Sequence, residues 1–128
     1  MYSKNIFERF FTHKNAGQVK KADGTGLYKS EQGNDEIKVY LKIEEGVIID
    51  AKFKTFGGVS AIVSADVGMD LIKNKKIDDA LMVSEEDINL SLGGLPEGQM
   101  QSALMVVRGI ANAVKNYRKK MIRLALKK

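Results

Sequence analysis

Residues 50–62 read DAKFKTFGGVSAI, and this stretch contains the end of one structural element and the start of another. Apolar residues alternate with lysines from Ala51 to Lys54, which is typical of a strand with one buried face. The Gly-Gly pair at 57–58 then provides a flexible corner. After it, apolar residues at spacings of three and four predict a helix that begins near Val59 or Ser60 and contains Ile62, Ala65, Met69 and Ile72.

The period of two extends upstream of this stretch, from Gly26 to Phe56, whereas residues 15–26 have the composition of a loop. Glu45 and Gly46 interrupt the alternation and predict a turn between two strands. We expect an antiparallel meander with one lysine-rich face and one buried face, formed by Ile37, Val39, Leu41, Ile43, Val47, Ile49, Ala51 and Phe53.

Capping residues and apolar spacing predict further helices on both sides of the meander. Ser3 caps a short helix that ends near Phe11, and Ser84 with its following acids caps another that ends near Gly93. Pro96 and Glu97 open a long C-terminal helix whose end projects beyond the core. Its stripe against the sheet is expected to be Leu104, Val107, Ile110, Ala111, Val114, Tyr117, Met121 and Leu124. The order of elements predicts an α+β fold, a three-stranded antiparallel sheet packed against a helical layer.

Composition is that of one globular domain spanning residues 1–128, with 44% hydrophobic and 29% charged residues. No apolar run or cleavable signal pattern is present, so we expect a cytoplasmic protein without a transmembrane segment. Eight of the 21 Lys and Arg residues follow Glu97, in a stretch without acids. The C-terminal helix is therefore expected to end in a basic extension at about residues 115–128.

Collinear motifs resemble the IscU and NifU N-terminal family of iron–sulfur scaffolds over roughly residues 2–120. The family pattern at residues 50–62 is DAKFKTFGCGSAI, so Gly58 stands where the family has a cluster-binding cysteine. By the same alignment, Gly33 replaces the cysteine of a CGD motif that ends here at Asp35. In a family MHCS motif, Gln101 replaces the histidine and Ser102 replaces the third cysteine. The resemblance implies the same α+β fold.

The chain contains no cysteine, although the family's chemistry requires thiolates to ligate iron and to accept sulfur as a persulfide. Glycine and a neutral serine do neither, and Asp35 remains as a lone oxygen ligand. Ser102 has no histidine in a familiar arrangement to activate it as a nucleophile. We therefore expect no iron–sulfur cluster, no resident cofactor and no enzymatic activity.

Residues beside the lost cysteines have also changed. Val59 and Asn34 replace glycines of the family pattern, and Gln101 replaces a histidine. Deliberate removal of cysteines would normally replace the cysteines alone and leave the adjacent residues unchanged. The sequence therefore favours natural divergence to a degenerate, non-catalytic binding or regulatory module. The resemblance implies a cysteine desulfurase or another iron–sulfur assembly protein as its partner. Residues 95–99 read LPEGQ and depart from the LPPxK type of chaperone motif, which argues against chaperone binding.

Two alternatives remain open from the sequence. In the first, Asp35 and other non-thiol ligands hold iron or zinc weakly and deliver it; His13, the one histidine, is interpreted as a surface loop residue. In the second, the basic helix binds a polyanion through Lys115, Arg118, Lys119 and Arg123. Nucleic acid is not favoured, because Tyr117 is the one aromatic residue among these bases.

Overall fold

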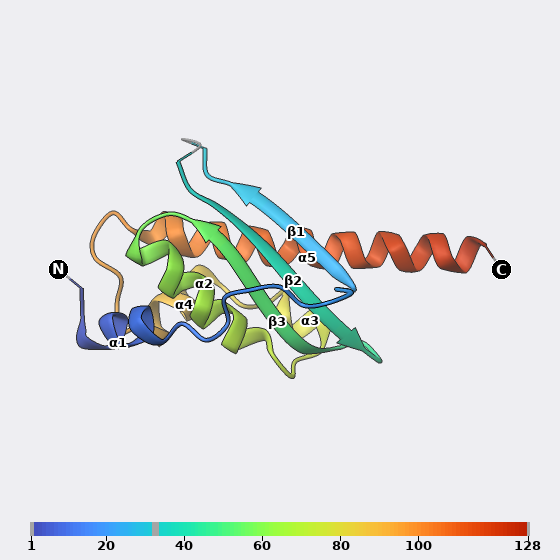
Figure 1. The fold of residues 1–128 in the computed structure, drawn as a ribbon, viewed down its shortest axis with the longest axis horizontal. Coiled ribbons are helices and arrows are strands. Elements are labelled where there is room, and N and C mark those ends of the chain that lie inside the picture. Colours follow the sequence, from blue (N-terminus) through green and yellow to red (C-terminus); the bar gives the residue numbers. More distant parts are fainter. Residues whose placement is uncertain (1, 32–33, 128) are drawn as a thin grey trace.

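The computed structural model describes residues 2–31 and 34–127, and at its centre lies a three-stranded antiparallel sheet (Figure 1). The strands are β1 (Gly24–Lys29), β2 (Glu36–Glu44) and β3 (Val47–Phe56), in the order β1-β2-β3. Glu45 and Gly46 form the turn between β2 and β3, with φ of 50° and 76°. The predicted meander is confirmed, and β1 starts two residues earlier than the alternation indicated.

Helices cover one face of the sheet (Figure 1). They are α1 (Lys4–Thr12), α2 (Val59–Ile72), α3 (Ile77–Ala80), α4 (Glu85–Ser91) and α5 (Met100–Leu126). The long α5 lies along β1 and β2, α2 packs on β3, and both α1 and α4 contact α2. The α+β class and the long C-terminal helix are thus confirmed, whereas α3 was not predicted. Among the helices that the structure describes, none is both long and apolar enough to cross a membrane.

Capping side chains begin α1 and α4 as the sequence predicted. Oγ of Ser3 accepts a hydrogen bond from the Ile6 amide at 3.2 Å, and Ser84 forms a reciprocal capping box with Asp87. The prediction that the last helix opens at Pro96 was wrong, because α5 begins at Met100. Gly98 has φ of 83°, a left-handed conformation that separates the turn at Pro96 from the helix.

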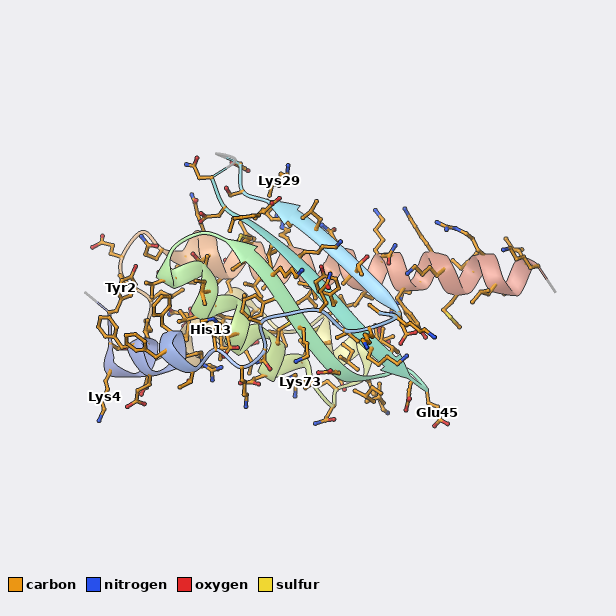
Figure 2. The ribbon with its side chains drawn as sticks, viewed as in Figure 1. Tyr2, Lys4, His13, Lys29, Glu45 and Lys73 are labelled. Carbon is orange, nitrogen blue, oxygen red and sulfur yellow. The ribbon has the colours of Figure 1, made fainter. Side chains whose placement is uncertain are left out.

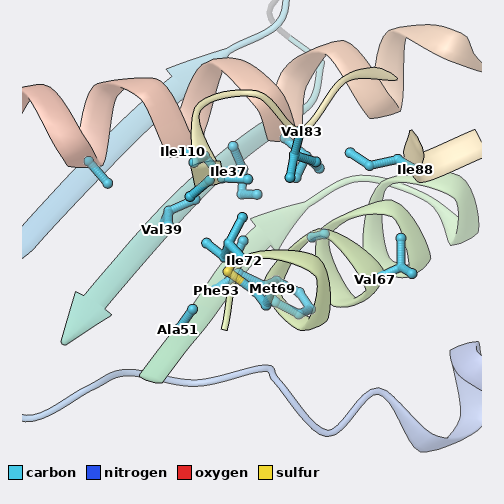
Figure 3. Packing of buried hydrophobic residues seen from close by; sticks show 14 of the residues in the cluster. Ile37, Val39, Ala51, Phe53, Val67, Met69, Ile72, Val83, Ile88 and Ile110 are labelled. Atoms are coloured by element: carbon cyan, nitrogen blue, oxygen red, sulfur yellow. The ribbon is translucent and has the colours of Figure 1, made fainter. Parts of the chain in front are cut away.

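The hydrophobic core lies between the sheet and the helices (Figure 3). Strand residues such as Ile37, Val39 and Phe53 contribute one side, and helix residues such as Met69 and Ile110 contribute the other. The prediction that Ile49 points inward was wrong, because it is 40% exposed and Ile48 is fully buried. A register shift pairs Lys42 with Asp50 and Ile43 with Ile48, so Ile49 is the extra residue of a β-bulge.

Two glycines of β1 let α5 approach the sheet closely. A methyl group at Gly26 would lie 2.2 Å from the Ala113 amide nitrogen, and one at Gly24 would lie 2.5 Å from the Ala113 carbonyl oxygen. This contact turns small residues of α5 towards the sheet, so its buried face is Ser102, Ala103, Met105, Val106, Gly109, Ile110, Ala113 and Val114.

The predicted stripe of α5 is therefore correct only in part. Ala111 is exposed because the close contact with β1 is made by the neighbouring small residues. Met121 and Leu124 are also exposed, by 47% and 55%, because the helix has passed the end of the sheet (Figure 1). The expected projection of the helix end is observed.

Candidate functional site

Positions corresponding to the family's ligands come from three segments that lie at one end of the molecule (Figure 1). Asp35 precedes β2, Gly58 precedes α2, and Ser102 lies in the first turn of α5. Figure 2 shows Lys29 at this end of the sheet and Glu45 at the opposite end. Gly33, which replaces the cysteine of the CGD motif, lies outside the residues that the structure describes.

Asp35 closes the loop between β1 and β2. Its carbonyl oxygen accepts a hydrogen bond from the Ser30 amide at 2.8 Å, and its own amide donates to Oγ of Ser30 at 3.2 Å. A methyl group at Gly57 would lie 3.1 Å from Oδ1 of Asp35, so the carboxylate packs against the glycine corner before α2. An open pocket of about 350 Å³ adjoins it and is lined also by Lys29, Asn34, Glu36 and Phe56.

Gly58 occupies the N-cap position of α2 without a capping side chain. Its φ is −84°, which any residue adopts, and a Cβ placed there would have no atom within 4 Å. The position thus has room for a side chain but presents none.

Ser102 and Gln101 are adjacent in α5 but differ in their exposure to solvent. Ser102 is 5% exposed and belongs to the core-facing side of α5, whereas Gln101 is exposed. Gln101 lines a small pocket of about 100 Å³ together with Ser30 and Glu31 of the β1–β2 loop. The start of α5 is therefore next to the loop that carries Asp35.

The donor set at this end of the molecule does not suit an iron–sulfur cluster. The family's ligand positions that the structure describes supply one carboxylate, one hydroxyl and one amide, while clusters are held by thiolates. Among residues 2–31 and 34–127, no group of three or more His, Asp and Glu side chains could hold a metal ion. His13 follows α1, and its Nδ1 lies 2.5 Å from the Phe10 carbonyl oxygen (Figure 2).

A partly buried ionic cluster between α1 and α2 was missed by the sequence analysis. Nη1 of Arg9 donates to Oδ2 of Asp66 at 2.6 Å and to Oδ2 of Asp70 at 2.9 Å. The Asn15 amide donates to the other Asp66 oxygen at 2.9 Å, and the Asn15 side chain donates to Asp70 at 3.0 Å. Two acids four residues apart in an otherwise apolar helix were the signal that could have revealed it.

The same cluster shifts the pKa values of Asp70 and Arg9. Burial alone would raise the pKa of Asp70, but hydrogen bonds from Asn15 and Arg9, together with the charges of Lys14 and Arg9, hold it below its ordinary value. Burial would lower the pKa of Arg9, and its two carboxylate partners raise it instead. Both groups are therefore charged at neutral pH, which suits a structural ion pair.

The basic residues singled out near the C-terminus lie in the C-terminal half of α5. Lys115, Lys119 and Arg123 are exposed. Arg118 is also exposed, but its Nη2 donates to Oδ1 of Asp78 at 2.7 Å, so one of the four bases already has an intramolecular partner.

Comparisons with known proteins agree with this architecture. A family model described as the NifU-like N terminal domain matches residues 1–123. The iron-sulfur cluster assembly scaffold protein IscU 1 of Archaeoglobus fulgidus is 31% identical over 120 residues, which are 94% of this chain and 78% of that protein. The iron-sulfur cluster assembly protein IscU of Plasmodium falciparum is 38% identical over 124 residues, covering 94% of this chain and 76% of that protein.

The nitrogen fixation protein NifU of Azotobacter chroococcum mcd 1 is 39% identical over 95% of this chain, which corresponds to 40% of its own length. A solved NifU-like protein (N-terminal) from Brucella abortus superimposes with a TM-score of 0.70 at 20% identity, covering 92% of this chain and 94% of that one. That likeness shows the fold. Together with the family match over most of the sequence, it shows that the chain belongs to the family of NifU-like N-terminal domains.

Proposed function

We propose that this chain is a non-catalytic binding or regulatory module of iron–sulfur cluster assembly that does not itself hold a cluster. The observation that carries the proposal is the absence of cysteine from a chain that keeps the family's fold. Cluster ligation and persulfide transfer both require thiolates. Gly58 and Ser102, which stand at two of the ligand positions, offer no replacement for them.

The environment of the remaining polar groups also favours a non-enzymatic role. Ser102 is buried in the first turn of α5, and His13 lies in the segment after α1, where its Nδ1 contacts a backbone carbonyl. A serine nucleophile requires a base within hydrogen-bond reach, and no such contact between these two residues is present among the described hydrogen bonds. We therefore propose a binding role in the cytoplasm, with a cysteine desulfurase or another iron–sulfur assembly protein as partner.

Anaerobic reconstitution tests the central part of the proposal. The purified chain is incubated with ferrous iron and sulfide and desalted, and then iron, zinc and acid-labile sulfide per chain are quantified. We expect neither metal nor sulfide in stoichiometric amount. A stoichiometric content of iron and sulfide would contradict the proposal, and metal without sulfide would favour iron or zinc carriage through Asp35.

A variant with restored thiols provides the matched control. Gly33→Cys, Gly58→Cys and Ser102→Cys together place cysteine at the three positions that correspond to the family's ligands. At Gly58 the backbone and the free space accept the side chain. If this variant binds iron and sulfide and the wild type binds neither, the missing thiolates explain why the wild type holds no cluster.

A further inference from the structure

A groove of about 630 Å³ crosses the lysine-rich face of the sheet and reaches round the edge of β3. Its lining includes Leu27 of β1, Lys38 of β2, and Lys54 and Phe56 of β3. Ala16 and Gly17 close it at the β3 edge, where the Gly17 amide donates to the Phe53 carbonyl oxygen at 2.8 Å. None of these residues corresponds to a ligand position of the family's cysteines.

Strand register makes the floor of this groove continuous. Leu27 lies opposite Lys38, and Lys38 lies opposite Lys54, so the three residues form one row across the sheet. In the next row Glu36 lies between Lys29 and Phe56. Directly opposed side chains are about 5 Å apart at Cβ, which brings the apolar and basic groups of the floor into contact range of a single ligand.

Large apolar side chains of the floor are open to solvent. Leu27 is 51% exposed and Phe56 is 72% exposed, although both belong to strands. The partly exposed Ile62 adds apolar surface at the β3 edge of the groove, where Phe53, which is 2% exposed, lies beneath it. An exposed apolar surface that is concave and adjoins a few polar groups is the usual character of a ligand site.

The charges of the groove are not balanced within the described part of the chain. Glu36 is the acid of the lining, and its Oε2 lies 4.0 Å from Nζ of Lys29. Lys38 and Lys54 are directly opposed like charges, and neither forms an ion pair with a described residue. Nζ of Lys38 lies 5.3 Å above the Tyr40 ring. Because opposed like charges destabilise a sheet, an anion placed between the two lysines would relieve their repulsion.

We propose that this groove binds a long-chain carboxylate. The carboxylate lies between Lys38 and Lys54, and the apolar chain covers Phe56 and the apolar edge of β3. The volume is within the range of small-molecule sites, and the combination of one cationic centre with an apolar surface selects an amphipathic anion over a polyanion. This binding activity is separate from the proposed role in cluster assembly and does not depend on it.

Titration of the full chain with dodecanoate, kept below its micelle concentration, tests the proposal by calorimetry. We expect saturable binding at one site. Lys38→Gln with Lys54→Gln should weaken it about fivefold, since an exposed charge pair contributes up to about 1 kcal/mol, which corresponds to about fivefold in Kd. Phe56→Ser should weaken binding of dodecanoate and of the uncharged dodecanol alike, whereas the double lysine variant should weaken only dodecanoate.

Matched control variants replace two lysines and one large apolar residue outside the groove. Lys75→Gln with Lys76→Gln, and Leu124→Ser, change exposed residues and should leave the affinity unchanged. Circular dichroism verifies that each variant is folded. The proposal is overturned by the absence of saturable binding, by equal effects of groove and control variants, or by equal affinities for dodecanoate and dodecanol. Binding of an acidic peptide without binding of dodecanoate would also overturn it.

Discussion

Arg9 donates a hydrogen bond of 2.6 Å to Oδ2 of Asp66 and thereby fixes α1 on α2. The side chain of Asp66 is 2% exposed and that of Arg9 is 27% exposed, so the pair is largely removed from water. The other oxygen of Asp66 accepts the Asn15 amide at 2.9 Å. One carboxylate therefore holds both α1 and the segment that lies along the edge of β3.

Replacement of this carboxylate should be strongly destabilising. Asp66→Ala leaves Arg9 with Asp70 as its remaining partner and leaves the buried Asn15 amide without an acceptor. We expect a loss of about 2–3 kcal/mol in the free energy of unfolding, measured by urea denaturation. Glu8→Ala serves as the control, because Glu8 forms an exposed pair with Lys4 at 3.9 Å and should cost less than about 0.5 kcal/mol. Equal losses in the two variants would contradict the assigned role.

Asp70 makes the stability of this cluster depend on pH. Its pKa in the folded chain is below the ordinary value of 3.8, so the folded state binds fewer protons than the unfolded state in this range. The contribution of Asp70 is fully present above the unfolded pKa and is lost as pH falls through the folded pKa. Comparison of wild type with Asp70→Asn should therefore show a stability difference at neutral pH that shrinks below pH 3.8. A difference that stays constant with pH would contradict this account.

The approach of α5 to β1 depends on Gly26. An alanine methyl group there would lie 2.2 Å from the Ala113 amide nitrogen and 2.4 Å from the Gly109 carbonyl oxygen, and both are backbone atoms that cannot rotate away. Gly26→Ala should therefore cost more than about 3 kcal/mol, or prevent folding. Gly58→Ser is the matched control, because that position is open and a serine N-cap is favourable; thermal denaturation should show little change.

Local periodicity explains why most of the fold could be predicted from the sequence. The alternation in β2 and β3 and the caps at Ser3 and Ser84 depend on neighbouring residues, and each formed as expected. The bulge at Ile49 depends instead on how β3 pairs with β2, which no local pattern records. Periodicity likewise identifies an apolar face of α5 but not the point at which the sheet beneath it ends.

The candidate site, like the fold, could be predicted from the sequence only in part. Motif order placed Asp35, Gly58 and Ser102 in segments that the fold brings to one end of the molecule (Figure 1). The contact between Arg9 and Asp66 joins residues 57 positions apart through the docking of two helices, so the spacing of Asp66 and Asp70 could indicate a partnered pair of acids but not which residue is the partner. The groove over Lys38 and Lys54 also required the strand register.

The projecting end of α5 should be dispensable for folding. From Met121 to Lys127 every residue is exposed, and the last buried residue of the helix is Val114. Truncation after Lys120 keeps Tyr117 and the pair between Arg118 and Asp78, so it removes no core contact. We expect the midpoint of thermal unfolding to change by less than about 2 °C, because exposed helix ends contribute little to packing. A truncation before Val114 removes buried surface and should lower the midpoint markedly. If truncation after Lys120 lowered it as much, the extension would have to pack on the domain, contrary to the exposure of Met121 and Leu124.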